Sequence, residues 1–146
     1  MNSNLPKTIF ITGATSGFGK ATAKLFNEKG WQTIITGRRA DRLEELAEEL
    51  GQNSLPLSFD VSDRQSVLTA VKNLPPNFNK ISVLCNNAGL ALGLEGADNA
   101  NLDDWDEMID TNIKGLVYAT RSILPLMIDN GEGHIINLGS VAGSYP

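Results

Sequence analysis

Short apolar runs alternate with stretches of helical period along the whole chain. The runs are rich in β-branched residues, and near-continuous apolar strands are typical of a sheet that is covered on both faces. Strands that alternate with helices favour right-handed βαβ crossovers. The pattern therefore predicts an α/β fold with a doubly wound parallel sheet in a three-layer αβα arrangement. The five predicted strands are Lys7–Thr12, Trp31–Thr36, Leu55–Phe59, Ile81–Cys85 and His134–Leu138.

Helical periodicity fills the segments between these strands. Gly30 is expected to end the first helix and Gly51 the second, because glycine commonly follows a helix C-terminus. Asp41 is the expected N-cap of the second helix, and Ser62 is expected to open the third. The predicted apolar faces are Phe18, Ala21, Leu25 and Phe26 in the first helix, Leu43, Leu46, Ala47 and Leu50 in the second, and Val67, Leu68 and Val71 in the third.

The longest helical stretch runs from about Leu102 to Asn130, and we expect it to bend or split at Gly115 and Pro125. Surface loops are expected at 73–79 and 93–101. The chain shows no internal repeat and no linker, so residues 1–146 are interpreted as one domain.

Composition limits the classes of function. With a net charge of −5 the chain lacks the excess of basic residues that a general nucleic-acid binder needs. No apolar run approaches the roughly 20 residues of a membrane span. The lone Cys85 allows neither an intramolecular disulfide nor a cysteine-based zinc site, and it favours a reducing, cytoplasmic setting. His134 stands without a metal-ligating partner nearby in the sequence, so no metal site is predicted.

A glycine-rich turn joins the first strand to the first helix, with the spacing G-x-x-x-G-x-G. The first glycine would permit a tight turn, the second would let a pyrophosphate approach the backbone, and the third would let the helix pack closely. N–H groups and the dipole at the helix start attract phosphate. A turn that binds nothing is the alternative. The candidate cofactor-binding residues here are Gly13, Thr15, Ser16, Gly17, Phe18 and Gly19.

Four motifs, in the right order, resemble the short-chain dehydrogenase/reductase family. They are the turn Thr12–Gly19, the sequence Asn86–Gly89 (NNAG) after the fourth strand, Asn112 within a helix, and Gly139–Gly143 (GSVAG) after the fifth strand. The resemblance covers essentially the whole chain and implies a Rossmann-type fold. It also implies that residues 1–146 are the NADP-binding, N-terminal portion of a dehydrogenase, truncated after the fifth strand.

The end of the second strand indicates which nucleotide is bound. A carboxylate there would bind the ribose 2′-hydroxyl of NAD, whereas a 2′-phosphate requires a cation. Arg38 and Arg39 stand at this point, and adjacent guanidinium groups suit the bidentate recognition of phosphate. The alternative is a pair of solvated surface arginines. Asp41 is interpreted as a helix cap rather than a ribose ligand, so the predicted cofactor is NADP.

The resemblance assigns further cofactor contacts after the third and fourth strands. Asp60 would accept a hydrogen bond from the adenine amino group and Val61 would flank the ring, although Asp60 could equally be a turn residue. Asn87 would approach the nicotinamide-side ribose, and Ala88 and Gly89 would let the cofactor near the backbone. Asn86 is expected to tie neighbouring strands together through its amide.

Two catalytic positions follow from the same resemblance. Ser140 would hydrogen-bond the carbonyl or alcohol of the substrate, and Asn112 would hold a water in a proton relay. The alternatives are a loop serine and a core asparagine with satisfied hydrogen bonds. The family's proton donor is a Tyr with a Lys four residues later. Tyr118 is followed by Ser122 at that spacing and Tyr145 only by Pro146, so we expect the 146-residue chain alone to be inactive.

The residues around Asn87 and Asn112 are similar to those of microbial NADP-dependent 3-hydroxy acid dehydrogenases, which act on serine, L-allo-threonine or malonic semialdehyde. The expected partner is thus a small hydroxy acid or carbonyl substrate. Neither nucleic acid nor a membrane is an expected partner. The family also implies a homodimer or homotetramer, and the fifth strand is expected to be an unpaired apolar edge. Alternatives are a general NADPH carbonyl reductase, a non-catalytic NADP-binding module and, less favoured by the arginine pair, a methyltransferase.

Overall fold

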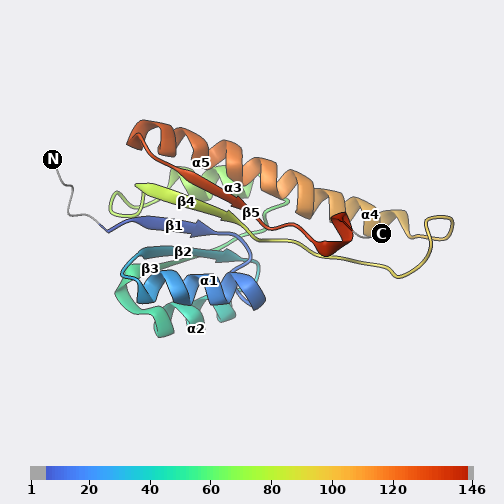
Figure 1. Ribbon diagram of the computed structural model, residues 1–146, viewed down its shortest axis with the longest axis horizontal. Coiled ribbons are helices and arrows are strands. Elements are labelled where there is room, and N and C mark those ends of the chain that lie inside the picture. The colour runs from blue at the N-terminus through green and yellow to red at the C-terminus, as the bar shows by residue number, and fades with distance from the viewer. Residues whose placement is uncertain (1–5, 145–146) are drawn as a thin grey trace.

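Five parallel strands form one sheet in the order β3-β2-β1-β4-β5 (Figure 1). The computed structural model describes residues 6–144. Every predicted strand is present to within two residues at either end, which confirms the doubly wound α/β prediction. The strands are β1 Thr8–Ile11, β2 Gln32–Gly37, β3 Ser54–Ser58, β4 Ile81–Asn86 and β5 His134–Asn137.

Helices cover both faces of this sheet and give the three predicted layers. Helices α1 and α2 lie on one face, and α3 and α5 on the other, while α4 extends beyond the carboxyl ends of the strands (Figure 1). Within residues 6–144, no helix is both long and apolar enough to cross a membrane. The helices are α1 Gly17–Glu28, α2 Ala40–Leu50, α3 Arg64–Lys72, α4 Leu102–Ile109 and α5 Leu116–Asn130.

The core consists of two apolar clusters, one on each face of the sheet. Because neighbouring side chains of a strand point to opposite faces, Ile9 and Ile11 belong to one cluster and Phe10 to the other. The first cluster includes Leu43 and Leu46 of α2, and the second includes residues of α3 and α5. Both faces of the central strands are therefore buried, which is why their sequences read as continuous apolar runs.

The predicted apolar face of α1 is wrong in three of its four members. Phe18 and Leu25 are 79% and 53% exposed, and Ala21 is also exposed, whereas Gly19 and Ala23 are buried. A Cβ on Gly19 would overlap the carbonyl oxygen of Gly13. The helix approaches the turn so closely that only small residues fit beneath it, and the large apolar side chains lie outside.

Two predicted helix caps are also wrong. Helix α2 begins after Arg39, and Asp41 lies within the first turn, where its charge favours the positive end of the helix dipole. Helix α3 is capped by Asp63, whose Oδ1 accepts from the backbone N of Gln65 at 3.0 Å. Ser62 instead donates its hydroxyl to Asp60. Arg39, before α2, makes a tertiary contact with Thr15, whereas the bonds of Ser62 and Asp63 are local.

The long helical stretch is interrupted once, at the predicted glycine. A π-helical segment, Asp110–Gly115, separates α4 from α5. A Cβ on Gly115 would lie 2.8 Å from Cγ2 of Val61, so glycine permits the helix to pass close to the chain that follows β3. Pro125, by contrast, lies inside α5, which continues through it without a split. Strand β5 occupies the predicted edge position of the sheet.

Candidate functional site

A cavity of about 480 Å³ lies at the carboxyl ends of β1 to β4. The strand order reverses between β1 and β4, and ligands of open α/β sheets bind in the crevice at such a point. Four separate connections and the π-helical segment contribute to its wall. The lining residues are Gly13, Thr15, Ser16, Gly37, Arg38, Arg39, Phe59, Asp60, Val61, Asn87, Ala88, Gly89, Leu90 and Thr111.

The three glycines of the first turn meet different requirements. Gly13 has φ +67°, and a Cβ there would lie 2.8 Å from the Cα of Ala88. A Cβ on Gly19 would overlap both Gly13 and the side chain of Asn87. Gly17 has φ +53° but open space around its Cβ position. The first and third glycines therefore allow close packing within the protein, whereas the second leaves room at the helix start. Ser16, the N-cap of α1, makes no side-chain capping bond there.

Thr12 connects the first turn to the loop after β4. Its Oγ1 accepts from the backbone N–H groups of Asn87 and Ala88, both at 3.0 Å, and donates to the carbonyl of Cys85 at 3.5 Å. The side chain is 3% exposed. This buried hydroxyl therefore fixes the edge of the cavity that Asn87 and Ala88 form. The sequence showed Thr12 only as the first residue of the motif.

The two asparagines that follow β4 both make structural hydrogen bonds. Asn86 donates from Nδ2 to Thr120 Oγ1 at 3.0 Å and to Asn137 Oδ1 at 2.8 Å, which confirms that it ties neighbouring strands together. Asn87 donates from Nδ2 to the carbonyls of Thr12 and Gly13, at 2.9 and 2.8 Å. Asn87 thus lines the cavity while its amide N–H groups hold the glycine turn, a second function that the sequence did not indicate.

The two arginines at the end of β2 both line the cavity. Arg39 Nη2 donates to Thr15 Oγ1 at 2.9 Å, which fixes one guanidinium group against the glycine turn. Arg38 Nη1 lies 3.9 Å from Asp60 Oδ2 and 3.9 Å from Glu107 Oε1. The side chain of Arg38 remains 62% exposed. Two cationic side chains therefore line the cavity from adjacent positions. Strand β2, which directly precedes them, contains no acidic residue.

The turn role of Asp60 is confirmed, and its contact with an adenine stays a prediction. Its Oδ1 accepts from the backbone N of Ser62 at 2.9 Å and from the Ser62 hydroxyl at 2.7 Å, as expected of a turn residue. It also lines the cavity beside Val61. The turn therefore holds the carboxylate in place at the cavity wall.

The two predicted catalytic residues lie outside the cavity lining. Asn112, in the π-helical segment, is exposed and forms two bonds of 2.8 Å with the backbone of Leu90, one to its carbonyl and one from its N–H. Of the alternative of a core asparagine with satisfied hydrogen bonds, the satisfied amide is confirmed and the core position is wrong, because the side chain is exposed. Ser140, after β5, is exposed, and its Oγ accepts from the backbone N of Ala142 at 3.1 Å.

The cavity lining differs from the predicted set of cofactor-binding residues. Gly37, Phe59, Leu90 and Thr111 complete its wall, and of these only Leu90 directly follows a quoted motif. Gly17, Phe18 and Gly19 were expected to contact a cofactor but are not among its lining residues. Tyr145 lies outside the described residues. Within residues 6–144, no group of three His, Cys, Asp or Glu side chains could hold a metal ion.

The chain is similar to known proteins over nearly its whole length. A family model described as short chain dehydrogenase matches residues 7–146. A probable NADP-dependent dehydrogenase of Haemophilus influenzae is 55% identical over 95% of this chain and 55% of its own length. An NADP-dependent 3-hydroxy acid dehydrogenase of Salmonella typhi is 51% identical over 94% of this chain and 56% of its own length. The chain thus spans about half the length of the curated relatives it matches.

A solved structure agrees with these sequence matches. The closed form of a serine dehydrogenase, complexed with NADP⁺, matches with a TM-score of 0.93 and 49% sequence identity. The match covers 95% of this chain and 56% of that one. The predicted family resemblance and the predicted fold are therefore both confirmed.

Proposed function

This chain belongs to the short-chain dehydrogenase family, and from that premise we propose that its cavity binds NADP in an oxidoreductase acting on a small 3-hydroxy acid. The observation that carries the proposal is the pair Arg38 and Arg39, which line one cavity together with the glycine turn. Relatives described as NADP-dependent and a neighbour complexed with NADP⁺ support it. Because the chain spans about half of those relatives, the activity is proposed for the whole protein.

The residues present fit the parts of such a cofactor. Ser16, the N-cap of α1, lines the cavity, and this position suits a pyrophosphate, since helix starts attract negative charge. Arg39 is already oriented by Thr15, and guanidinium groups recognise phosphate through paired hydrogen bonds. The oriented carboxylate of Asp60, beside Val61, suits the amino group and ring of an adenine. The residues that line the cavity therefore suit an adenine nucleotide with an additional phosphate.

When bound, the nicotinamide would give hydride to a carbonyl or take it from an alcohol. The chain's own residues would position the reactants. Asn112 holds the backbone of Leu90 at the cavity wall, and Thr12 holds Asn87 and Ala88 beside it. Ser140, exposed after β5, would donate its hydroxyl to the substrate oxygen. Neither Tyr118 nor Tyr145 precedes a lysine by four residues, so the family's acid–base pair is not among these residues.

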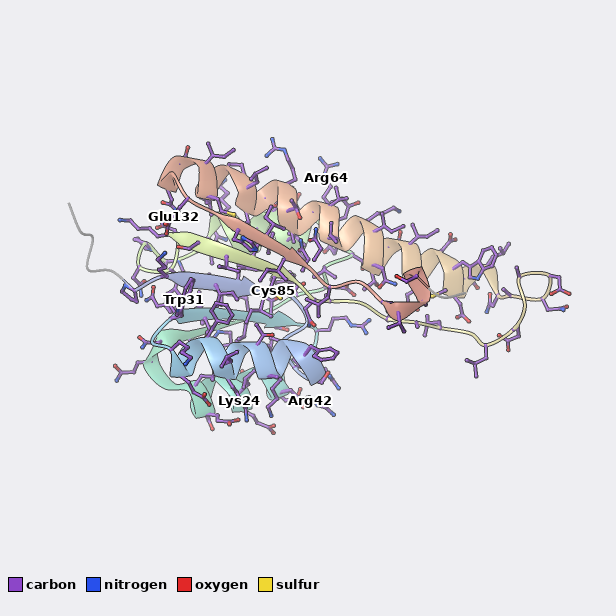
Figure 2. All side chains as sticks on the ribbon, in the orientation of Figure 1. Lys24, Trp31, Arg42, Arg64, Cys85 and Glu132 are labelled. Atoms are coloured by element: carbon purple, nitrogen blue, oxygen red, sulfur yellow. The ribbon has the colours of Figure 1, made fainter. Side chains whose placement is uncertain are left out.

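The nucleotide preference can be tested directly on this chain by calorimetric titration. Adenosine 2′,5′-bisphosphate should bind more tightly than 5′-AMP, by about 10- to 100-fold, because charge-assisted hydrogen bonds contribute about 1.5–3 kcal/mol. Arg39→Ala should remove most of this preference. Arg42→Ala is the matched control, since Arg42 lies on α2 and is not among the cavity residues (Figure 2). Equal affinity for both nucleotides would overturn the proposal.

The substrate proposal requires the whole protein and a substrate panel. Serine, L-allo-threonine and malonic semialdehyde should be turned over with NADP(H) in preference to simple aldehydes and ketones. A preference for the simple carbonyls would favour a general carbonyl reductase. Turnover of none of them, together with tight binding of adenosine 2′,5′-bisphosphate, would favour a non-catalytic NADP-binding module.

The buried thiol of Cys85 agrees with a reducing compartment, and we propose a cytoplasmic location.

We also propose that the protein is a homo-oligomer that packs through α4 and α5. These helices and the π-helical segment between them carry a row of exposed apolar side chains at spacings of three, four and seven residues, which is typical of a face that packs against another helix. Light scattering should give a dimer or tetramer, and Ile113→Glu should shift it toward the monomer. A monomeric wild-type protein would contradict this. The row comprises Leu102, Trp105, Ile109, Ile113, Val117, Leu124 and Ile128.

A further inference from the structure

Arg38 and Arg39 are adjacent, but their electrostatic surroundings differ. Arg39 donates to the neutral hydroxyl of Thr15, and no carboxylate in residues 6–144 forms an ion pair with it. Arg38 lies between two carboxylates, 3.9 Å from Asp60 and 3.9 Å from Glu107. One guanidinium group is thus available to an incoming anion, and the other is shared with anions of the protein itself.

The two carboxylates at Arg38 are held differently. Asp60 lies two residues after the end of β3 and is fixed through two hydrogen bonds from Ser62. Glu107 comes from α4, 69 positions beyond Arg38, and its side chain makes no other ion pair or hydrogen bond in the part of the chain that the structure describes. Thr111, four residues after Glu107 on the same helical stretch, lines the cavity. Glu107 therefore stands beside the cavity wall with Arg38 as its partner.

A second phosphate on the nucleotide must compete with this carboxylate. The side chains of Arg38 and Glu107 are 62% and 52% exposed, and exposed ion pairs of this kind contribute about 0.2–1 kcal/mol. The phosphate must separate Arg38 from Glu107, and the freed carboxylate then lies near the phosphate and repels it. A nucleotide without the phosphate neither separates this ion pair nor is repelled by the freed carboxylate.

We propose that Glu107 is a specificity-determining residue that competes with the 2′-phosphate for Arg38. It lowers the preference for the phosphorylated nucleotide below what the two arginines would give on their own. This inference rests on the proposed function, because it assumes that the arginine pair receives the phosphate.

The test compares the affinities of adenosine 2′,5′-bisphosphate and 5′-AMP in Glu107→Gln, an isosteric change that removes the charge. The ratio of the two affinities should rise by about two- to five-fold, as loss of an exposed ion pair allows. Asp106→Asn is the matched control, because it removes the same charge one position away, and Asp106 forms no ion pair with Arg38. Its ratio should stay near that of the wild type.

The double variant Arg38→Ala/Glu107→Gln identifies the partner. If competition for Arg38 is the mechanism, Glu107→Gln should change the ratio much less in the Arg38→Ala background than in the wild type. Glu107→Ala, which also removes the charge, should raise the affinity ratio as Glu107→Gln does. Circular dichroism spectra check that each variant is folded. A wild type without preference for the bisphosphate would defeat the proposed function. A preference that Glu107→Gln and Glu107→Ala leave unchanged, or that Asp106→Asn raises equally, would defeat this inference alone.

Discussion

Replacing Thr12 by valine should destabilise the protein and loosen the cavity at the same time. Valine has the same shape, but it lacks the oxygen that accepts from the N–H groups of Asn87 and Ala88. Each buried donor left without a partner costs about 1–3 kcal/mol, and these two are only partly buried. We therefore expect a loss of about 2–4 kcal/mol, a large fraction of the roughly 5–15 kcal/mol that stabilises a typical domain.

Thr33 offers a matched control for this change. It lies in β2 and is fully buried, like Thr12, but its Oγ1 has no hydrogen-bond partner in the described part of the chain. Thr33→Val removes an unpaired hydroxyl from the core, and we expect it to leave the stability unchanged or to raise it by about 1 kcal/mol. The same chemical substitution should therefore destabilise the protein at Thr12, which directly follows β1, but not at Thr33.

Urea denaturation followed by circular dichroism measures both variants, and titration with adenosine 2′,5′-bisphosphate measures the cavity. Thr12→Val should lower the urea midpoint and weaken nucleotide binding, because the loop of Asn87 and Ala88 lines the site. Thr33→Val should do neither. Equal destabilisation by the two variants would refute the reasoning, since it would mean that the hydrogen bonds of Thr12 contribute nothing beyond side-chain packing.

Three further predictions concern other features of the structure. Gly19→Ala should cost about 1–3 kcal/mol in thermal denaturation and abolish nucleotide binding, because its Cβ would overlap Gly13 and Asn87; Gly143→Ala, with open space around it, should be neutral. Burial raises the pKa of the Cys85 thiol, so iodoacetamide at pH 8 should label this single cysteine only in urea, and rapid labelling of the native chain would contradict its burial (Figure 2). The hydrogen bond from Ser66 lowers the pKa of Asp63 from its ordinary value of 3.8, so Asp63→Ala should lower the melting temperature at pH 7. That difference should be complete above about pH 5 and shrink as the pH falls below 3.8, and a difference that persists undiminished at pH 2 would oppose the assignment.

Much of the fold follows from local sequence patterns. Buried strands such as β1 and β4 are apolar on both faces, so their sequences mark them without knowledge of their neighbours. Gly30 ends α1 and Gly51 ends α2 as expected, because the positive φ angles there favour glycine. The face of α1 could not be predicted in this way. Periodicity finds large apolar residues such as Phe18, whereas the close approach at Gly19 selects small ones.

Local sequence patterns likewise identify some residues of the candidate site and miss others. The glycine turn, the arginine pair and Asp60 could be identified because each lies within two residues of the end of a strand, and parallel strands bring their carboxyl ends to one edge. Glu107 belongs to α4 and Thr111 to the π-helical segment after it, far along the chain, and no local pattern marks them as neighbours of Arg38 or of the cavity. The ligand contacts assigned to these residues stay predictions.

The sequence by itself determined which segments become strands and which residues arrive at the edge where they end. Backbone conformation and hydrophobic burial act over a few residues, so they leave a readable pattern. Only the tertiary structure decided which polar groups bond there: Thr12 to the loop after β4, Asn112 to Leu90, and Glu107 to Arg38. These contacts join residues 22 to 76 positions apart, and their formation depends on distances of a few ångströms that the packing of the whole domain sets.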